Sequence, residues 1–205
     1  MKYISLKLFI KLALLDLFCV LIDIVYSTRS AGLSVWGRAI ADSSVHFLVA
    51  VACWAVVVNG SAQSLILESL ICGLLSSLVD VDHFIEARQL SLSAAISVNH
   101  RGALHCFATI PVVAGLIWVV RESLCDVARY LTSSILIQST IMNLHIIISV
   151  AWLSHQLRDA TRRGIYIMPM CNTNPIPQYL YIAAVTVFSY LLNIFWVPYN
   201  PGDNR

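Results

Sequence analysis

Histidine and aspartate residues form three pairs in this sequence whose spacing suits a helix. The pairs are Asp42 with His46, Asp80 with His83, and His155 with Asp159. Residues three or four positions apart lie on one face of a helix, so each pair would present an imidazole and a carboxylate together. Mixed nitrogen and oxygen ligands suit zinc, with iron or manganese as alternatives. The pairs therefore predict a site for a divalent metal ion.

The elements that must position these pairs are long apolar helices in a membrane. Of the 205 residues, 59% are hydrophobic and only 12% are charged, whereas a soluble domain carries about 25% charged residues. Six segments approach the ~20 apolar residues that cross a bilayer core of ~30 Å. They are residues 8–26, 43–58, 64–81, 104–120, 133–154 and 179–197. We therefore expect an all-α polytopic transmembrane bundle of about six helices, with residues 1–205 forming a single membrane-embedded domain.

The alternating directions of these helices would gather most of the histidines at one membrane face. The three longer connections, 27–42, 82–103 and 155–178, share that face, and five histidines lie beside them at helix ends. The five are His46, His83, His100, His105 and His155. Ionisable groups at membrane depth are costly, so they are functional hypotheses by default. A simpler interpretation also fits, because helix ends lie at the polar interface and Asp42 could cap the second helix.

The net charge and the cysteines indicate which partners and which cross-links to expect. The formal net charge is +2, which is too near neutral to favour nucleic acid and leaves a weak attraction to anionic lipid headgroups. Membrane lipids are therefore the expected partners. The six cysteines contain no CxxC pair and four lie in apolar runs, which favours buried free thiols over a disulfide framework. We expect a multi-pass protein of the endomembrane system.

Three motifs, taken together, resemble a known family. They are Asp80-Val81-Asp82-His83, His100-Arg101-Gly102-Ala103-Leu104-His105, and Ser154-His155-Gln156-Leu157-Arg158-Asp159 followed by Gly164 and Pro169. With His46 upstream, this order resembles the YdjM-like family of predicted membrane-bound metal-dependent hydrolases. Leu104 stands where that family usually has a threonine, so a hydroxyl that could bind a ligand or substrate is missing. The resemblance implies a helical membrane protein with a hydrolytic metal centre, distantly similar to zinc-dependent phospholipase C folds.

The resemblance also implies roles for individual side chains. The expected metal ligands are His46, Asp80, His83, His105, His155 and Asp159. Asp82 would be either a ligand or an acceptor that orients an imidazole, and His100 would act as a general acid. Arg101 and Arg158 would clamp a phosphate, because guanidinium matches phosphate oxygens bidentately, although both could equally be ordinary interfacial arginines. A site at headgroup depth would suit a lipid phosphoester as substrate, with zinc as the expected cofactor.

Two other classes of function also fit the sequence. A non-catalytic membrane scaffold could keep the hydrolase-like fold and a structural metal. A transporter or proton pathway would use the ionisable residues at membrane depth, which are Asp16, Asp23, Glu68 and His145. Transporters commonly contain repeats, and this sequence shows none. Asp16 and Asp23 are seven residues apart and share a helix face, so we favour bonding within the bundle for this pair.

Overall fold

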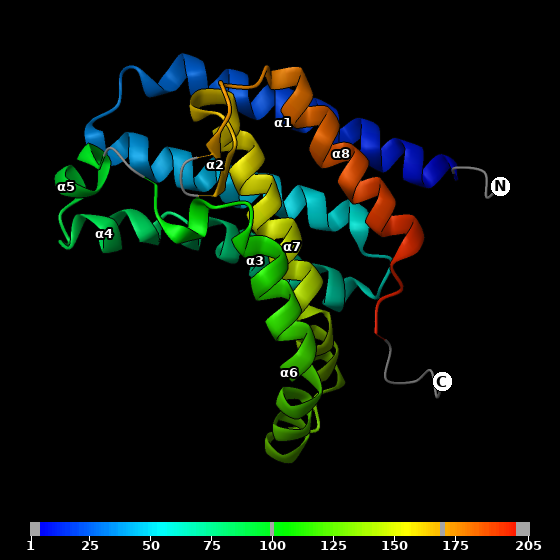
Figure 1. Cartoon of the computed structure of the whole chain (residues 1–205). Coiled ribbons are helices and arrows are strands. Elements are labelled where there is room, and N and C mark those ends of the chain that lie inside the picture. The colour runs from blue at the N-terminus through cyan, green and yellow to red at the C-terminus, as the bar shows by residue number, and fades with distance from the viewer. Residues whose placement is uncertain (1–4, 99–100, 169–170, 200–205) are drawn as a thin grey trace.

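The computed structural model describes residues 5–98, 101–168 and 171–199, and the fold is a bundle of α-helices (Figure 1). The helices are α1 (Leu6–Ser30), α2 (Val35–Val57), α3 (Ala62–Leu78), α4 (Val81–Ala87), α5 (Leu92–Ser97), α6 (Thr109–Leu131), α7 (Ile135–Arg163) and α8 (Gln178–Phe195). A 3-10 turn, η1 (Ala103–His105), precedes α6, and a small antiparallel hairpin of β1 (Tyr166–Met168) and β2 (Cys171–Asn172) follows α7. The expected all-α bundle is confirmed.

Four segments of the described chain are long and apolar enough to cross a membrane. They are Val35–Val57, Ala62–Ala87, Ile135–Arg163 and Gln178–Phe195. The expected spans 8–26 and 104–120 are also largely helical, within α1 and α6. Charged residues are spread along both helices, among them Asp16 and Asp23 in α1 and Arg121 and Asp126 in α6, so neither has an apolar stretch as long as those of the four spans.

Serine caps decide where several of these helices begin. The hydroxyl oxygens of Ser5, Ser34, Ser61 and Ser134 each accept a backbone N–H from the residue three positions later, the usual N-cap arrangement. The cap at Ser34 starts α2 well before the expected residue 43. Asp42 therefore lies inside the helix, and its expected role as a cap is wrong.

Two of the histidines consequently lie deeper than the sequence indicated. His46 is near the middle of α2, and His155 is followed by two further turns of α7 before the helix ends at Gly164. Gly164 has φ +75°, and a Cβ there would overlap the carbonyl oxygen of Thr173. The expectation that these histidines stand at helix ends is therefore wrong, because the helices extend past the apolar stretches.

The apolar core lies where α2, α3, α7 and α8 meet. Val49, Trp54, Ile147 and Tyr181 are almost completely buried there. The helix α6 packs mainly along α7, and the two project from the rest of the bundle as a hairpin (Figure 1). All six cysteines are unpaired, five of them buried and Cys171 exposed. Long α7 thus belongs both to the core and to the projecting hairpin.

Candidate metal centre

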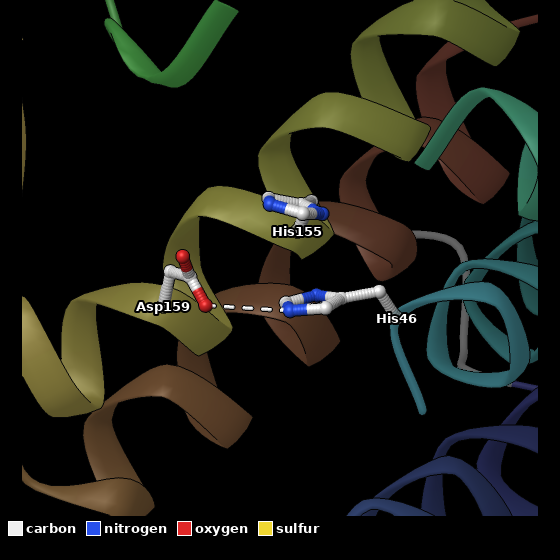
Figure 2. Close-up of side chains that lie close together, drawn as sticks. All are labelled: His46, His155 and Asp159. Atoms are coloured by element: carbon white, nitrogen blue, oxygen red, sulfur yellow. Dashed lines mark ion pairs between the residues drawn. The ribbon is translucent and has the colours of Figure 1, made fainter. Parts of the chain in front are cut away.

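One face of α7 carries His155 and Asp159, and α2 brings His46 against them (Figure 2). The imidazole rings of His46 and His155 stack with centroids 3.8 Å apart. The Nε2 atom of His46 lies 3.3 Å from Oδ1 of Asp159. All three side chains are buried, so the polar atoms must find their partners within the bundle.

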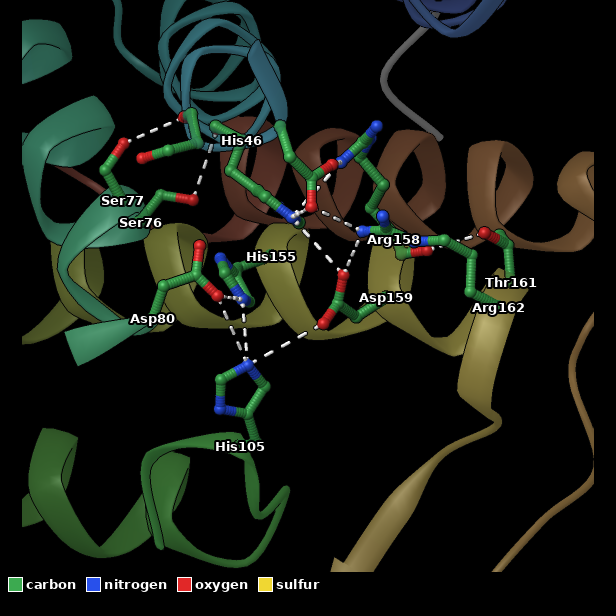
Figure 3. Close-up of polar contacts among 12 residues, drawn as sticks. His46, Ser76, Ser77, Asp80, His105, His155, Arg158, Asp159, Thr161 and Arg162 are labelled. Atoms are coloured by element: carbon green, nitrogen blue, oxygen red, sulfur yellow. Dashed lines mark hydrogen bonds and ion pairs between the residues drawn. The ribbon is translucent and has the colours of Figure 1, made fainter. Parts of the chain in front are cut away.

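Asp80 and His105 complete this group from two other elements (Figure 3). Asp80 lies between α3 and α4, and His105 ends the 3-10 turn η1. The Nε2 atoms of His105 and His155 are 3.3 Å apart, and Oδ1 of Asp80 lies 3.6 Å from each. The second oxygen of Asp159, Oδ2, lies 3.6 Å from Nε2 of His105. We call Asp80, His105, His155 and Asp159 the donor cluster.

The spacing of the donor cluster fits a tetrahedral ion. Zinc binds nitrogen and oxygen at about 2.0–2.1 Å in tetrahedral geometry, which puts neighbouring donors about 3.3–3.4 Å apart. The three separations among Oδ1 of Asp80, Nε2 of His105 and Nε2 of His155 are 3.3, 3.6 and 3.6 Å, close to that edge length, and Oδ2 of Asp159 lies 3.6 Å from Nε2 of His105. Two imidazole Nε2 atoms facing each other can share only one proton, whereas a cation between them satisfies both lone pairs. The chemistry of the donors therefore suits a divalent metal.

Asp82 fixes the orientation of His105. The Nδ1 atom of His105 is 2.9 Å from Oδ1 of Asp82, and the backbone N–H of Leu104 donates to Oδ2 of the same carboxylate at 3.1 Å. A Cβ on Gly102 would overlap the Asp82 carboxylate, so this close approach requires glycine. A carboxylate on the far nitrogen sets the tautomer that leaves Nε2 free as a ligand. Of the two roles expected for Asp82, the geometry favours the orienting acceptor.

The surrounding carboxylates also change the affinity of His105 for protons. Burial by itself lowers the pKa of His105, but hydrogen bonds to Asp80 and Asp82 outweigh it and raise the pKa to about 9. His105 therefore carries a proton at neutral pH when no other cation is present. The cluster of carboxylates attracts positive charge, which a metal ion could supply in place of that proton.

His46 and His83 lie beside the donor cluster. The Nη1 atom of Arg158 is 3.1 Å from Nε2 of His46, so a guanidinium cation lies beside the atom with which His46 would bind a metal. The Nε2 atom of His83 lies 3.9 Å from Oδ1 of Asp80, and its ring is tilted against that of His105. His46 also forms a group of potential ligands with His155 and Asp159, and His83 forms one with Asp82 and His105, so both predicted ligands lie next to the donor cluster.

The two arginines expected to clamp a phosphate are both engaged with the protein. Arg158 donates from Nε to Asp23 at 2.9 Å and from Nη1 to Asp42 at 2.8 Å, and only 5% of its side chain is exposed. The bonding of Asp23 within the bundle thus agrees with the interpretation preferred from the sequence. Arg101 donates from Nη1 to the carbonyl oxygen of Gly164 at 2.8 Å. His100 lies outside the described residues.

A cavity of about 440 Å³ opens beside the donor cluster. Its lining contains the apolar side chains of Trp36, Ile40, Phe84, Leu92 and Ile96 and the polar side chains of Asp80, His83, Asp159, Arg162 and Arg163. A mainly apolar lining with a few polar groups is typical of a ligand site.

Sequence reasoning missed the arginines that line this cavity. Arg162 donates from Nη2 to Asp159 at 2.6 Å and to Asp42 at 3.0 Å, while Arg163 beside it is exposed. The spacing of Asp159 and Arg162, three positions apart on a helix, could have predicted the bond between them. Gly102 was also visible within its motif, but its need for close approach to Asp82 depends on the fold.

The chain is similar over most of its length to curated membrane proteins of vertebrates. It is 35% identical over 179 residues to transmembrane protein 267 of Mus musculus, covering 86% of this chain and 77% of that protein. It is 32% identical over 168 residues to the Xenopus laevis protein of the same name, covering 82% and 73%. The Bos taurus protein is 30% identical over 197 residues, covering 93% and 83%.

The other two comparisons give no match. No family model matches the chain, and no solved structure matches it either. The resemblance to YdjM-like hydrolases therefore gains no support from these comparisons, whereas the similarity to the vertebrate proteins extends across the motifs and the helices that carry them.

Proposed function

The chain belongs to the transmembrane protein 267 family, and we propose that this integral membrane protein is a metal-dependent hydrolase acting on lipid phosphoesters. The observation that carries the proposal is the donor cluster, whose spacing fits zinc, beside a mainly apolar cavity. The relatives carry a name that states a membrane location, so the activity rests on this site alone.

Asp80, His105 and His155 would hold the ion, because a catalytic zinc takes three protein ligands and leaves its fourth position to water. A divalent metal at such a site lowers the pKa of a bound water to about 7 and so provides hydroxide at neutral pH. Asp82 keeps the Nδ1 proton of His105 in place and its Nε2 free.

The cavity would receive the substrate. Its apolar side chains, among them Trp36, Ile40 and Phe84, would bind an acyl chain, and the exposed guanidinium of Arg163 would contact the phosphate. His83 lines the same cavity beside Asp80. Its Nε2 would pass a proton to the leaving oxygen, the role expected of His100 from the sequence.

The metal is tested on the full chain purified in detergent, with bound metal measured by elemental analysis. We expect wild type to carry a stoichiometric amount of zinc or another divalent ion and the double variant His105→Ala/His155→Ala to lose it. His145→Ala is the matched control, because His145 lies on α7 outside the cluster. If the double variant and wild type hold equal amounts of metal, the centre is not at this place.

Turnover is a separate measurement. The metal-loaded protein in nanodiscs should release phosphate or headgroup from phospholipids, and His83→Gln should lose that activity while it retains the metal. Metal without turnover would support the non-catalytic scaffold instead. Metal absent from wild type, even after loading, would contradict both.

A further inference from the structure

A second cavity lies at the opposite end of α3 from the donor cluster. It has a volume of about 480 Å³ and is lined by the connection between α2 and α3, the first turns of α3 and α7, and the residues that follow α8. Glu68 lines it, twelve positions before Asp80, which lies just past the end of α3, and twelve residues of helix span about 18 Å at 1.5 Å per residue. The two cavities are therefore separate.

Glu68 is the single charged side chain among the described residues that line this cavity. It is completely buried, and Asn143 donates to its Oε1 at 2.9 Å. Its Oε2 accepts no hydrogen bond from any residue that the structure describes. Trp54 approaches the carboxyl from the core without reaching hydrogen-bond geometry. A buried carboxylate without a counter-charge is costly, so the cavity calls for a positive ligand.

Two basic side chains contact residues of the cavity lining, and both are bonded to groups other than Glu68. Lys11 donates from Nζ to the carbonyl oxygen of Val58 at 3.1 Å. Arg129 donates to Asp126 at 2.6 Å and to the Tyr199 hydroxyl at 3.4 Å. Neither Lys11 nor Arg129 bonds to Glu68 in this way, so a positive charge that neutralises Glu68 must come from outside the described residues.

We propose that this cavity binds a primary ammonium group, with the Glu68 carboxylate as its counter-ion. A quaternary ammonium would call for a cage of aromatic rings, and Tyr199 is the one aromatic residue in the described lining. The lining offers acceptors instead, including the hydroxyl oxygens of Ser64 and Ser139 and the side chain of Gln63, which suit the N–H donors of a primary amine. Calcium sites are built from several oxygen ligands that usually include more than one carboxylate, and Glu68 is the one carboxylate in the described lining.

The ammonium could belong to a lipid headgroup or to a free amine, and the two sources can be told apart. The full-length protein is titrated in detergent with ethanolamine or choline, and its unfolding midpoint is followed. In parallel, nanodiscs of phosphatidylcholine are compared with nanodiscs that also contain phosphatidylethanolamine. Choline and phosphatidylcholine serve as matched ligands, because they carry the same positive charge and no N–H.

We expect the ligands with N–H donors to raise the unfolding midpoint and the choline compounds to leave it unchanged. Stabilisation by free ethanolamine identifies a soluble amine, and stabilisation by phosphatidylethanolamine alone identifies the headgroup. Glu68→Gln should weaken binding about tenfold or more, the usual effect of losing a bond to a charged group. Glu122→Gln, on the exposed side of α6, should bind like wild type.

Several outcomes would overturn the proposal. The first is an equal response to ethanolamine and choline, and the second is no response to either source of ammonium. Undiminished binding by Glu68→Gln would have the same consequence. If that variant does not fold, the comparison of ethanolamine with choline on wild type still tests whether the cavity binds a primary ammonium group. Neither result depends on metal at the donor cluster, because the measurement uses no metal.

Discussion

Replacing Asp82 by asparagine tests whether this carboxylate orients His105. In the native arrangement one oxygen faces Nδ1 of His105 at 2.9 Å and the other accepts the Leu104 N–H at 3.1 Å. Asparagine keeps one acceptor oxygen, so one of the two contacts loses its acceptor and meets an amide N–H instead. The variant should therefore hold His105 in less favourable orientations while every donor to the ion remains present.

The expected loss of zinc affinity is about 10–100-fold, the usual effect of removing the carboxylate behind a metal-bound histidine, or about 1.4–2.7 kcal/mol. Affinity is measured by competition with a chromophoric chelator on detergent-solubilised protein. Asp126→Asn is the matched control, because Asp126 is an exposed aspartate that pairs with Arg129 on α6. Equal zinc affinity in Asp82→Asn and wild type would refute the reasoning, and a total loss of zinc would mark Asp82 as a ligand.

Three further results are expected. Gly102→Ala should weaken zinc binding without removing any polar group, because its Cβ displaces Asp82; affinity equal to wild type would show that the turn can adjust. Arg158→Met should lower the free energy of unfolding by about 3–5 kcal/mol, since it leaves the Asp23 carboxylate without its ion-pair partner and Asp42 with Arg162 alone, and an unchanged denaturation midpoint would contradict this. Zinc affinity should fall as the pH drops below about 9, because His105 must release its proton before it can bind the metal. A zinc affinity that stays constant between pH 6 and 9 would contradict this prediction.

The transmembrane class and the motif residues were accessible from the sequence because each depends on local patterns. Apolar stretches reveal helices, and the spacing of His155 and Asp159 places both on one face of α7. The helix start at Ser34 was missed because a polar turn and a first helical turn have similar composition, and the serine cap distinguishes them.

Long-range pairing lay beyond sequence reasoning. Arg158 bonds to Asp23, 135 residues earlier in the chain, and no local pattern connects the two. The same holds for the contact between Nε2 of His105 and Nε2 of His155. Which motif histidines face the ion and which ones surround it is determined by how α2 and η1 pack against α7, so the sequence motifs identify the set of candidates without ranking its members.

The residues of the donor cluster are positioned by elements of very different length. Asp80, His155 and Asp159 belong to long packed helices or their junctions, whereas His105 ends a three-residue turn that leads directly into α6. The helix α6 in turn packs mainly along α7. An ion held here would therefore pin the base of the projecting hairpin to the bundle. The turn is also held by Asp82 and by the amide of Gln156, which donates to the carbonyl oxygen of Leu104 at 2.8 Å, so metal binding would strengthen an attachment that the protein already makes.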